Sequence, residues 1–268
     1  MSVRAAILTA VLCLLASRLL PARIFADDQL ETLHGTCTIA PSTEPGHVRY
    51  DFTSDCASAG DNCNNHDHES NAPLTAFTGL ALADLGREGA HIEAKIVAEA
   101  GTISCSGLVH GLVLAGDFTF TPNPAFVQSM ARLGFTGLDS GKLEAYTVFH
   151  IDTQWIKQLQ AAGVTGMDSG NVIALHIFKI TPDFVRTMSD LGYAHLPADK
   201  LIAFGVHGVN PDEVKQYRAM GYNPDAEQLI QMRIFKVTPD FIHRMEARGF
   251  NNLTISKLVQ IRIFNLAD

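Results

Sequence analysis

The densest group of side chains that could bind a metal ion lies in one polar segment, Cys63-Asn64-Asn65-His66-Asp67-His68-Glu69. Two imidazoles beside a thiol and carboxylates form a donor set that zinc or copper accepts. The two histidines lie on one side of the chain only if it is extended there, and Cys63 is a poor ligand if it forms a disulfide. His66 and His68 are therefore weak metal candidates, and we expect a solvated polar loop without a cofactor.

Two other kinds of site lack their defining motifs. The acidic stretch from Asp61 to Glu69 has neither the D-x-D-x-D-G spacing nor the terminal bidentate glutamate of a calcium loop. A nucleophilic serine is often placed in a G-x-S-x-G turn, but the nearest string, Ile103 to Gly107, begins with isoleucine. These patterns favour binding over catalysis, and we assign no catalytic residue.

The amino terminus has the layout of a secretory signal peptide. Arg4 precedes an apolar run, Ala5 to Ala16, and Ala26 is a small residue suited to cleavage just before two aspartates. The run is too short to cross a bilayer as a helix. We predict a signal peptide at residues 1–26 and a mature protein that is periplasmic or extracellular, with no membrane span.

The charge distribution argues against nucleic acid as a partner. Without residues 1–26 the chain has 17 basic and 28 acidic side chains. Residues 27–119 hold 14 acidic and 3 basic side chains, whereas residues 120–268 hold 14 of each. Binding to phosphate backbones requires clustered Lys and Arg, which this distribution does not provide.

Four cysteines follow the predicted cleavage position: Cys37, Cys56, Cys63 and Cys105. An even number of cysteines in an exported chain indicates two disulfides. The sequence allows three pairings and does not choose among them. As a working hypothesis we pair Cys37 with Cys105, tying two strands, and Cys56 with Cys63, closing a small loop.

The pattern of residues 27–119 predicts a small antiparallel β domain. In His91 to Val97 apolar and charged residues alternate, as expected for a half-buried strand. Further predicted strands are His47 to Thr53, Thr102 to Val109 and Leu112 to Phe120. The polar stretch from Ser54 to Ala72 has no periodicity and is predicted to be an exposed loop.

Residues 120–268 contain five copies of a unit of about 29 residues, each with a helix-like segment that ends in glycine. The glycines are Gly134, Gly163, Gly192, Gly221 and Gly249. A period in this range is typical of tandem structural repeats. Because one unit cannot bury its own apolar face, we expect the copies to stack as a solenoid of α-hairpins.

The recurring residues of each unit are those that form and pack a helix. In the last copy, Thr238 can cap the first turn, and Pro239 suits the first helical position. Phe241 and Met245 lie on one helix face, and Gly249 can end the helix in a left-handed conformation. We therefore expect functional residues among those that differ between copies.

The second half of each unit leaves two structures open. The segments 172–180, 229–237 and 258–266 are rich in branched residues that fit either a helix face or a strand. We favour a second short helix buried between neighbouring units. The alternative is an α/β repeat with short parallel strands.

Three histidines, His150, His176 and His207, stand about one period apart. A row of histidines could respond to pH, but packing at the turns between helices is the preferred interpretation. Trp155 occupies the position that phenylalanine fills in other units, so we expect it in the core.

Several of these strings resemble a known protein region. AEAGTISCSG and GDFTFTPNPAF, followed by copies of V-T-P-D-F-I-x-x-M-x-x-x-G-F and L-V-Q-I-R-I-F, are similar to an uncharacterised bacterial repeat region. That region occurs in exported proteins and as the extracytoplasmic tail of some membrane metallopeptidases of the antirepressor (β-lactam sensor) class. The peptidase motif H-E-x-x-H is missing here, so the resemblance implies a sensing or interaction accessory.

Three functions are compatible with the sequence. The first is an exported, non-enzymatic scaffold whose solenoid surface binds a protein or peptide. The second is a small-ligand or metal sensor that uses the β domain, and the third is a hydrolase acting on envelope material, with a cleft near residues 119–126. We favour the first and leave the oligomeric state open.

Overall fold

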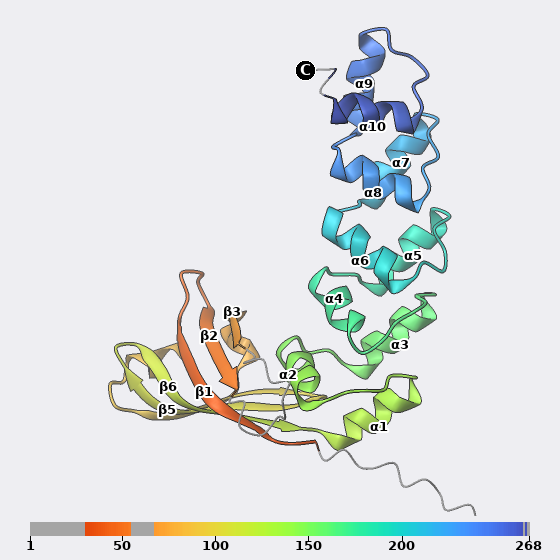
Figure 1. The fold of residues 1–268 in the computed structure, drawn as a ribbon. Coiled ribbons are helices and arrows are strands. Elements are labelled where there is room, and N and C mark those ends of the chain that lie inside the picture. Colours follow the sequence, from red (N-terminus) through yellow and green to blue (C-terminus); the bar gives the residue numbers. More distant parts are fainter. Residues whose placement is uncertain (1–29, 55–66, 265, 267–268) are drawn as a thin grey trace, which may run out of the picture. The chain divides into compact units, whose positions relative to one another are not determined.

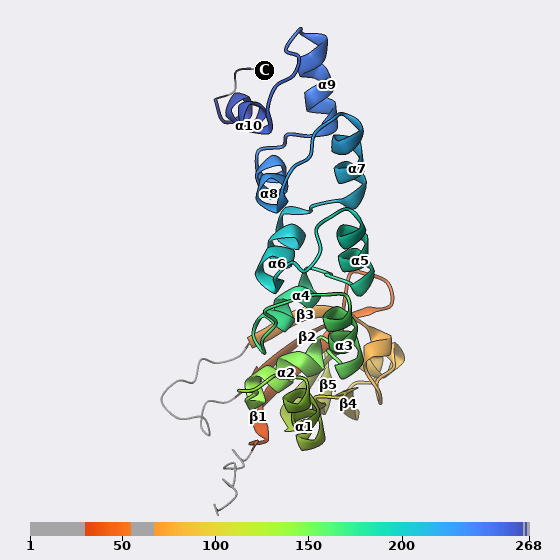
Figure 2. The same cartoon turned by 90° about the vertical axis from the view of Figure 1, so that its right-hand side faces the viewer.

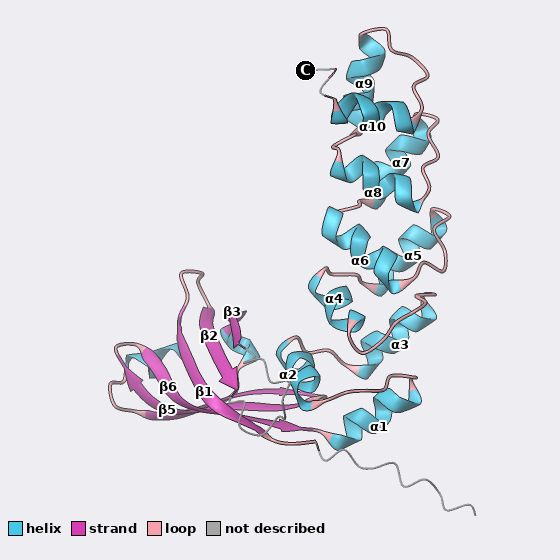
Figure 3. Cartoon of the chain, in the orientation of Figure 1, coloured by secondary structure: helices cyan, strands magenta, loops and turns pink. Residues whose placement is uncertain are grey.

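The computed structural model describes residues 30–54, 67–264 and 266, and it is of the mixed α+β class. Its first part is a curved, antiparallel half-barrel sheet of six strands in the order β3-β2-β1-β6-β5-β4 (Figure 3). The strands are β1 (Leu33–Pro41), β2 (His47–Ser54), β3 (Asp67–Pro73), β4 (His91–Ala98), β5 (Gly101–His110) and β6 (Val113–Pro122). Two short 3-10 helices, η2 (Leu74–Ala76) and η3 (Leu82–Gly86), lie between β3 and β4.

The alternation seen in the sequence sets which face of β4 is buried. Ile92, Ala94 and Ile96 are buried, whereas Glu93 is exposed and forms an ion pair with Lys95 on the outer face. The predicted strands at β2, β5 and β6 are likewise confirmed, each within two residues of its predicted ends. Side-chain alternation was sufficient to identify these strands because one face of the sheet is packed and the other is solvated.

The prediction of a loop from Ser54 to Ala72 is wrong in part. Residues 67–73 form β3, which pairs with β2 along its whole length, from Thr53 opposite Asp67 to His47 opposite Pro73. This strand lies at the edge of the sheet, and its residues 69–71 are exposed. Because an edge strand can be held by backbone hydrogen bonds alone, its side chains carry no apolar alternation.

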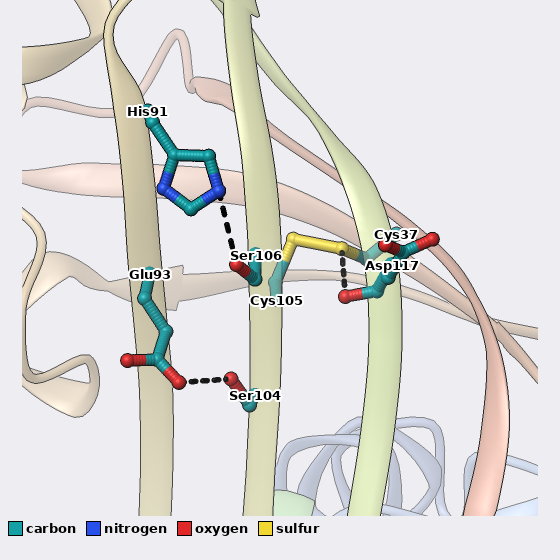
Figure 4. Close-up of a disulfide and its surroundings, with 7 residues drawn as sticks. All are labelled: Cys37, His91, Glu93, Ser104, Cys105, Ser106 and Asp117. Carbon is teal, nitrogen blue, oxygen red and sulfur yellow. Dashed lines mark hydrogen bonds between the residues drawn. A yellow bond between two sulfur atoms is a disulfide. The ribbon is translucent and has the colours of Figure 1, made fainter.

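The sheet is folded sharply along β6, and a disulfide bridges the fold. Cys37 on β1 and Cys105 on β5 are bonded, with their Cα atoms 5.8 Å apart, although β6 lies between the two strands. In a flat sheet, strands separated by a third strand lie about 9.6 Å apart. The Cys37–Cys105 pairing is confirmed (Figure 4); Cys56 and Cys63 lie outside the described residues.

Two glycines make this fold possible. Gly107 and Gly116 face each other across β5 and β6, and Gly116 also faces Cys37. A Cβ atom at Gly116 would lie 2.1 Å from the carbonyl oxygen of Ser106, and one at Gly107 would lie 2.0 Å from that of Ala115. Any side chain at these positions would force the strands apart, so both must be glycine for the backbones to approach this closely.

Ten helices follow the sheet within the described part of the chain (Figures 1 and 3). Their bounds are α1 (Pro124–Arg132), α2 (Ser140–Val148), α3 (Thr153–Ala161), α4 (Asn171–Ile177), α5 (Pro182–Asp190), α6 (Ala198–His207), α7 (Pro211–Ala219), α8 (Ala226–Ile234), α9 (Pro239–Ala247) and α10 (Ile255–Ile263). The change from strand to helix lies between Pro122 and Pro124, three residues after the predicted domain boundary. No helix in residues 30–54 or 67–264 combines the length and apolar character needed to cross a bilayer.

The helices form two rows. In the odd row, each odd-numbered helix contacts the next odd-numbered one from α1 to α9. In the even row, α4, α6, α8 and α10 contact one another in the same manner (Figure 2). Between the rows lies a core that includes Met188, Phe204, Tyr217 and Phe241. At the start of the even row, α2 packs on β4, β5 and β6.

The second half of each unit is helical, so the alternative of short parallel strands is wrong. The caps explain why. Asp225 accepts a hydrogen bond from the Gln228 amide and the Gln228 side chain accepts one from the Asp225 amide, a complete capping box at the start of α8. Thr254 caps α10 through the Lys257 amide. The predicted caps of α5, α7 and α9 are also present, at Thr181, Asn210 and Thr238.

The hydroxyl group of Tyr217 is a buried polar group that bonds to the main chain. It donates to the carbonyl oxygen of Val237 over 2.8 Å, from the core between the rows. We expect Tyr217→Phe to lower the free energy of unfolding by about 1–2 kcal/mol, because the buried carbonyl loses its donor. Urea denaturation measures this effect. Tyr222→Phe is the matched control, since that hydroxyl bonds to no described residue; an equal loss in both variants would contradict the prediction.

Candidate interaction surface

Four helices of the even row end on an exposed aliphatic side chain. The residue is the last helical one in α4, α8 and α10 and the last but one in α6. These side chains, which we call the aliphatic row, are Ile177 (47% exposed), Val206 (50%), Ile234 (47%) and Ile263 (48%). Because the exposed fraction is nearly the same in four successive helices, it results from the way the helices of the even row stack and not from one helix alone.

The helix geometry explains why these side chains point outward. Five positions before each member of the row stands a fully buried residue that packs inside the helical region. These buried residues are Val172, Leu201, Leu229 and Leu258. Five positions correspond to about 140° around an α-helix, so a side chain five residues after a core residue faces away from that core.

The aliphatic row has a regular pitch. Its members are 29, 28 and 29 residues apart in the sequence, and α4, α6, α8 and α10 lie against one another in that order (Figure 1). Packed helices are separated by about 8–10 Å, so the row presents one aliphatic side chain at each such step. An apolar line of this kind is typical of an interface and unusual on a free surface.

Charged residues of opposite sign lie at the two ends of these helices. Asp199 and Glu227 are exposed in the first turns of α6 and α8, and Lys179 and Lys236 follow the last turns of α4 and α8. Both lysines have left-handed backbones, with φ of 56° and 53°. A residue other than glycine in that conformation costs about 1 kcal/mol. Glu227 is already paired with Lys200 in the first turn of α6, at 2.5 Å, and the first turn of α10 carries Lys257, so the first turns do not form an acidic edge.

One further position joins consecutive helices of the even row. The residue just before each of Val206, Ile234 and Ile263 contacts the carboxyl end of the preceding even-numbered helix. Gly205 is so close to Phe178 that a Cβ atom would lie 2.6 Å from the Phe178 Cβ. Arg233 donates to the carbonyl oxygen of His207 (3.1 Å), and Arg262 donates to that of Lys236 (3.0 and 3.2 Å). These arginines satisfy carbonyls that a helix end leaves without a partner.

The three predicted histidines differ in their surroundings. His176 packs against the rings of Trp155 and Phe149, with centroids 5.2 and 6.2 Å apart, and burial together with nearby His150 lowers its pKa. His150 is exposed in a left-handed turn, and the carbonyl oxygen of His207 accepts from an arginine. Packing at turns, the preferred interpretation, matches His176, and Trp155 packs against a core cluster as expected.

A shallow groove opens near the carboxyl ends of α5 and α7. It has a volume of about 470 Å³ and is lined by Tyr193, Arg218 and residues 223–226. The guanidinium of Arg218 lies 5.6 Å from the centre of the Tyr193 ring and donates to the carbonyl oxygen of Leu191. The Tyr193 hydroxyl donates to that of Pro224 at 2.5 Å. These polar groups hold the two loops together, so the groove has a structural explanation.

No family model matches this chain, and no curated protein matches it either. The residues themselves are therefore the basis for any functional assignment.

The predicted metal candidates fall largely outside what the structure describes. His66 lies in the segment 55–66, and His68 is in β3, where only its backbone is described. Among the described side chains, no group of three or more histidine, cysteine or carboxylate residues is placed to hold a metal ion. The assignment of His66 and His68 as weak candidates stays a prediction.

The outer face of the sheet contains the contact most similar to a hydrolytic site. His91 Nε2 lies 3.5 Å from Ser106 Oγ, and Ser104 Oγ donates to Glu93 at 3.1 Å (Figure 4). Glu93 also pairs with Lys95 at 3.0 Å, and these contacts lower the pKa of its carboxyl. The carboxylate therefore bonds to Lys95 and Ser104 and does not orient His91, so the residues do not form a catalytic triad.

The junction where a hydrolase cleft was expected is occupied by packing and capping. Phe118, Phe120 and Phe126 are buried there. Asn123 caps α1 through the Ala125 amide and donates to the carbonyl oxygen of Glu99 at 2.9 Å. These side chains connect the sheet to the first helix.

Sequence reasoning missed the aliphatic row. The strings that contain it were interpreted as segments buried on two sides, because branched residues dominate them. The signal that could have found it is the shared ending: Ile177-Phe178-Lys179, Ile234-Phe235-Lys236 and Ile263-Phe264 stand at the ends of three helices. An aliphatic residue at a helix end, five positions after a core residue, indicates exposure.

Proposed function

We propose that this protein is an exported, non-enzymatic scaffold that binds a protein or peptide through a solenoid of five helix pairs. Two rows of helices with contacts between successive members support the solenoid. The apolar run followed by Ala26, together with the disulfide, supports export. The role as an accessory in envelope sensing follows from the resemblance of the sequence to the extracytoplasmic repeat region.

The aliphatic row is the observation that carries this proposal. Ile177, Val206, Ile234 and Ile263 are kept apolar and half exposed in four successive helices. Polar residues at these four positions would make the protein more soluble and would not disturb the core. Apolar side chains in a line are explained if a partner covers them.

The proposal is tested by capturing partners from the envelope fraction with the purified protein. The test variant is Ile177→Ser, Ile234→Ser. The control is Val97→Ser, Leu108→Ser, which removes two apolar side chains of similar exposure (57% and 45%) from the sheet.

We expect the wild-type and control proteins to retain the same bound chain, and the test variant to lose at least nine-tenths of it. Equal retention by the test variant would overturn the proposal that the aliphatic row is the binding surface.

A further inference from the structure

The groove near the carboxyl ends of α5 and α7 lies between the third and fourth helix pairs, whose loops are joined differently from those of the pairs before them. Between the second and third pairs the loops bond directly through their main chains. The Thr165 amide donates to the Leu196 carbonyl oxygen at 3.2 Å, and the Ala198 amide donates to the Thr165 carbonyl oxygen at 2.8 Å. These loops therefore pair as a short parallel β-bridge.

One pair further along, the described residues form no such bridge. Ala194, two residues after the glycine that ends the odd helix, is the equivalent of Thr165. Pro224, two residues before the even helix begins, is the equivalent of Leu196. The Pro224 carbonyl oxygen accepts from the Tyr193 hydroxyl at 2.5 Å, so the acceptor that the bridge would use is already occupied. The groove of about 470 Å³ lies where the bridge would be.

The main chain that lines the groove has hydrogen-bonding groups to spare. The amide and the carbonyl oxygen of Ala194, and the amide of Ala226 at the start of α8, bond to no described residue. The equivalent groups of Thr165 and Ala198 all take part in the bridge of the preceding pairs. An extended peptide bonds to open main-chain groups of this kind when it adds to a protein as a strand.

The charges that line the groove indicate which side chain such a peptide would carry. The Arg218 guanidinium donates to the Leu191 carbonyl oxygen and lies on the Tyr193 ring, and no described carboxylate pairs with it. Asp225 is the other charged residue of the lining, and its carboxylate caps α8 by accepting from the Gln228 amide at 2.8 Å. A guanidinium is well suited to binding a carboxylate.

We propose that the groove binds a short, extended peptide segment whose main chain bonds to Ala194 and Ala226 and whose acidic side chain pairs with Arg218. The volume of the groove lies within the range of about 300–1,000 Å³ that is usual for ligand sites. The groove contains no member of the aliphatic row, so this second site is independent of the binding surface proposed above.

The first test is an NMR titration of the isotope-labelled protein with the peptide acetyl-Ala-Glu-Ala-amide. We expect the amide resonances of Ala194 and Ala226 to shift, with a dissociation constant on the order of 1 mM, because so short a peptide makes few contacts. The neutral peptide acetyl-Ala-Gln-Ala-amide should bind about fivefold more weakly. Equal binding of the two peptides contradicts the pairing with Arg218. Acetate that reproduces the same shifts shows that the groove holds a carboxylate ion only, which overturns the inference.

Arg218→Gln is the most informative variant because the chain already has this side chain at the equivalent position. Gln160 donates to the Leu133 carbonyl oxygen at 3.1 Å, as Arg218 donates to that of Leu191. Glutamine should therefore keep the loop in place and remove only the charge. We expect the affinity for the glutamate peptide to fall about fivefold, to that of the glutamine peptide, whose own affinity stays unchanged. An unchanged affinity for the glutamate peptide contradicts the proposal.

Tyr193→Val tests the role of the hydroxyl, since Val164 is the equivalent residue of the preceding pair. The variant releases the Pro224 carbonyl oxygen, and we expect the Ala194 amide to donate to it and close the groove. Hydrogen exchange at Ala194 should then slow, and the shifts caused by the glutamate peptide should disappear. Peptide binding that survives this substitution overturns the inference. Circular dichroism confirms that each variant is folded.

The matched control is Ile177→Ser, Ile234→Ser, which alters the aliphatic row and should bind the glutamate peptide as the wild type does. A loss of peptide binding in this control contradicts the independence of the two sites. If the resonances of Ala194 and Ala226 in the wild type do not move at about 20 mM peptide, the groove is not a peptide site and the inference fails. The proposed function is decided separately, by capture from the envelope fraction.

Discussion

Replacing both bridged cysteines, Cys37→Ala with Cys105→Ala, is expected to lower the free energy of unfolding by about 4 kcal/mol. The bridge closes a loop with a sequence separation of 68 residues, and the estimate is the chain entropy that such a cross-link removes from the unfolded state. Losses of this size are a large part of the total stability of a typical domain. Denaturant unfolding of the double variant, followed by circular dichroism, measures the difference.

The position of the bridge gives a second reason for a large effect. It holds β1 and β5 together across β6, where Gly107 and Gly116 allow the backbones to approach. Both sulfur atoms belong to buried residues, and Cys37 Sγ lies 3.4 Å from the carbonyl oxygen of Asp117. Alanine avoids placing an unsatisfied hydroxyl in this core. A change below 1 kcal/mol would show that the glycine pair, and not the bridge, maintains the fold of the sheet.

A comparison variant uses the remaining cysteines. Cys56→Ala with Cys63→Ala would open the short loop that the sequence suggests, and a short loop is worth less, about 2 kcal/mol. A loss clearly smaller than that of the Cys37, Cys105 variant supports the predicted second pairing. No change at all would show that Cys56 and Cys63 are not bonded.

The sequence was informative where local physics decides the structure. Period-2 alternation located β4 and its neighbours because one face of each strand is buried. The threonine and asparagine caps located α5, α7 and α9 because their side chains bond to the first free amides of each helix. For α8 and α10, branched residues pointed equally to strand and helix, and the caps Asp225 and Thr254 were the deciding feature.

The features that were missed depend on tertiary context. Strand β3 is polar and held by its pairing with β2, so its residues give no periodic signal. The sharp fold of the sheet depends on Gly107 and Gly116 facing each other, a relation between strands that a single sequence does not display.

The candidate surface was missed for a different reason. Recurring residues were expected to build the helices, and the differing ones to carry function. Ile177, Ile234 and Ile263 recur and are nevertheless exposed. Recurrence shows that a position has the same surroundings in every helix pair, but it does not show whether those surroundings are core or solvent. In a stacked array, a recurring exposed residue forms a continuous surface, which a residue unique to one unit does not.

A buried carboxyl was also beyond the reach of sequence patterns, because only its place in the fold separates it from a surface residue. Glu144 lies in α2, which packs on the sheet, and its side chain is fully buried. Burial disfavours the charged form and raises the pKa of the Glu144 carboxyl from 4.5 to about 7. The stability of the protein is therefore coupled to pH through this residue.

The direction of the coupling follows from the two pKa values. Because the folded pKa lies above the unfolded one, the unfolded chain releases the proton first as pH rises. The stability contributed by the neutral carboxyl is complete below about pH 4.5 and is lost as pH rises through about 7. A difference of this size corresponds to about 3 kcal/mol.

We therefore expect Glu144→Gln, which is neutral at every pH, to exceed the wild type in unfolding free energy by about 3 kcal/mol more at pH 8 than at pH 4.5. Urea denaturation of both proteins across this range measures the difference, and groups common to both cancel. Glu93→Gln is the control: bonds to Lys95 and Ser104 lower that pKa, so the carboxylate stabilises the folded state at neutral pH and this contribution is lost as pH falls. Glu93→Gln should therefore not exceed the wild type in unfolding free energy at pH 8. If the gap between wild type and Glu144→Gln does not change with pH, the Glu144 carboxyl has an ordinary pKa and its burial is compensated in the folded protein.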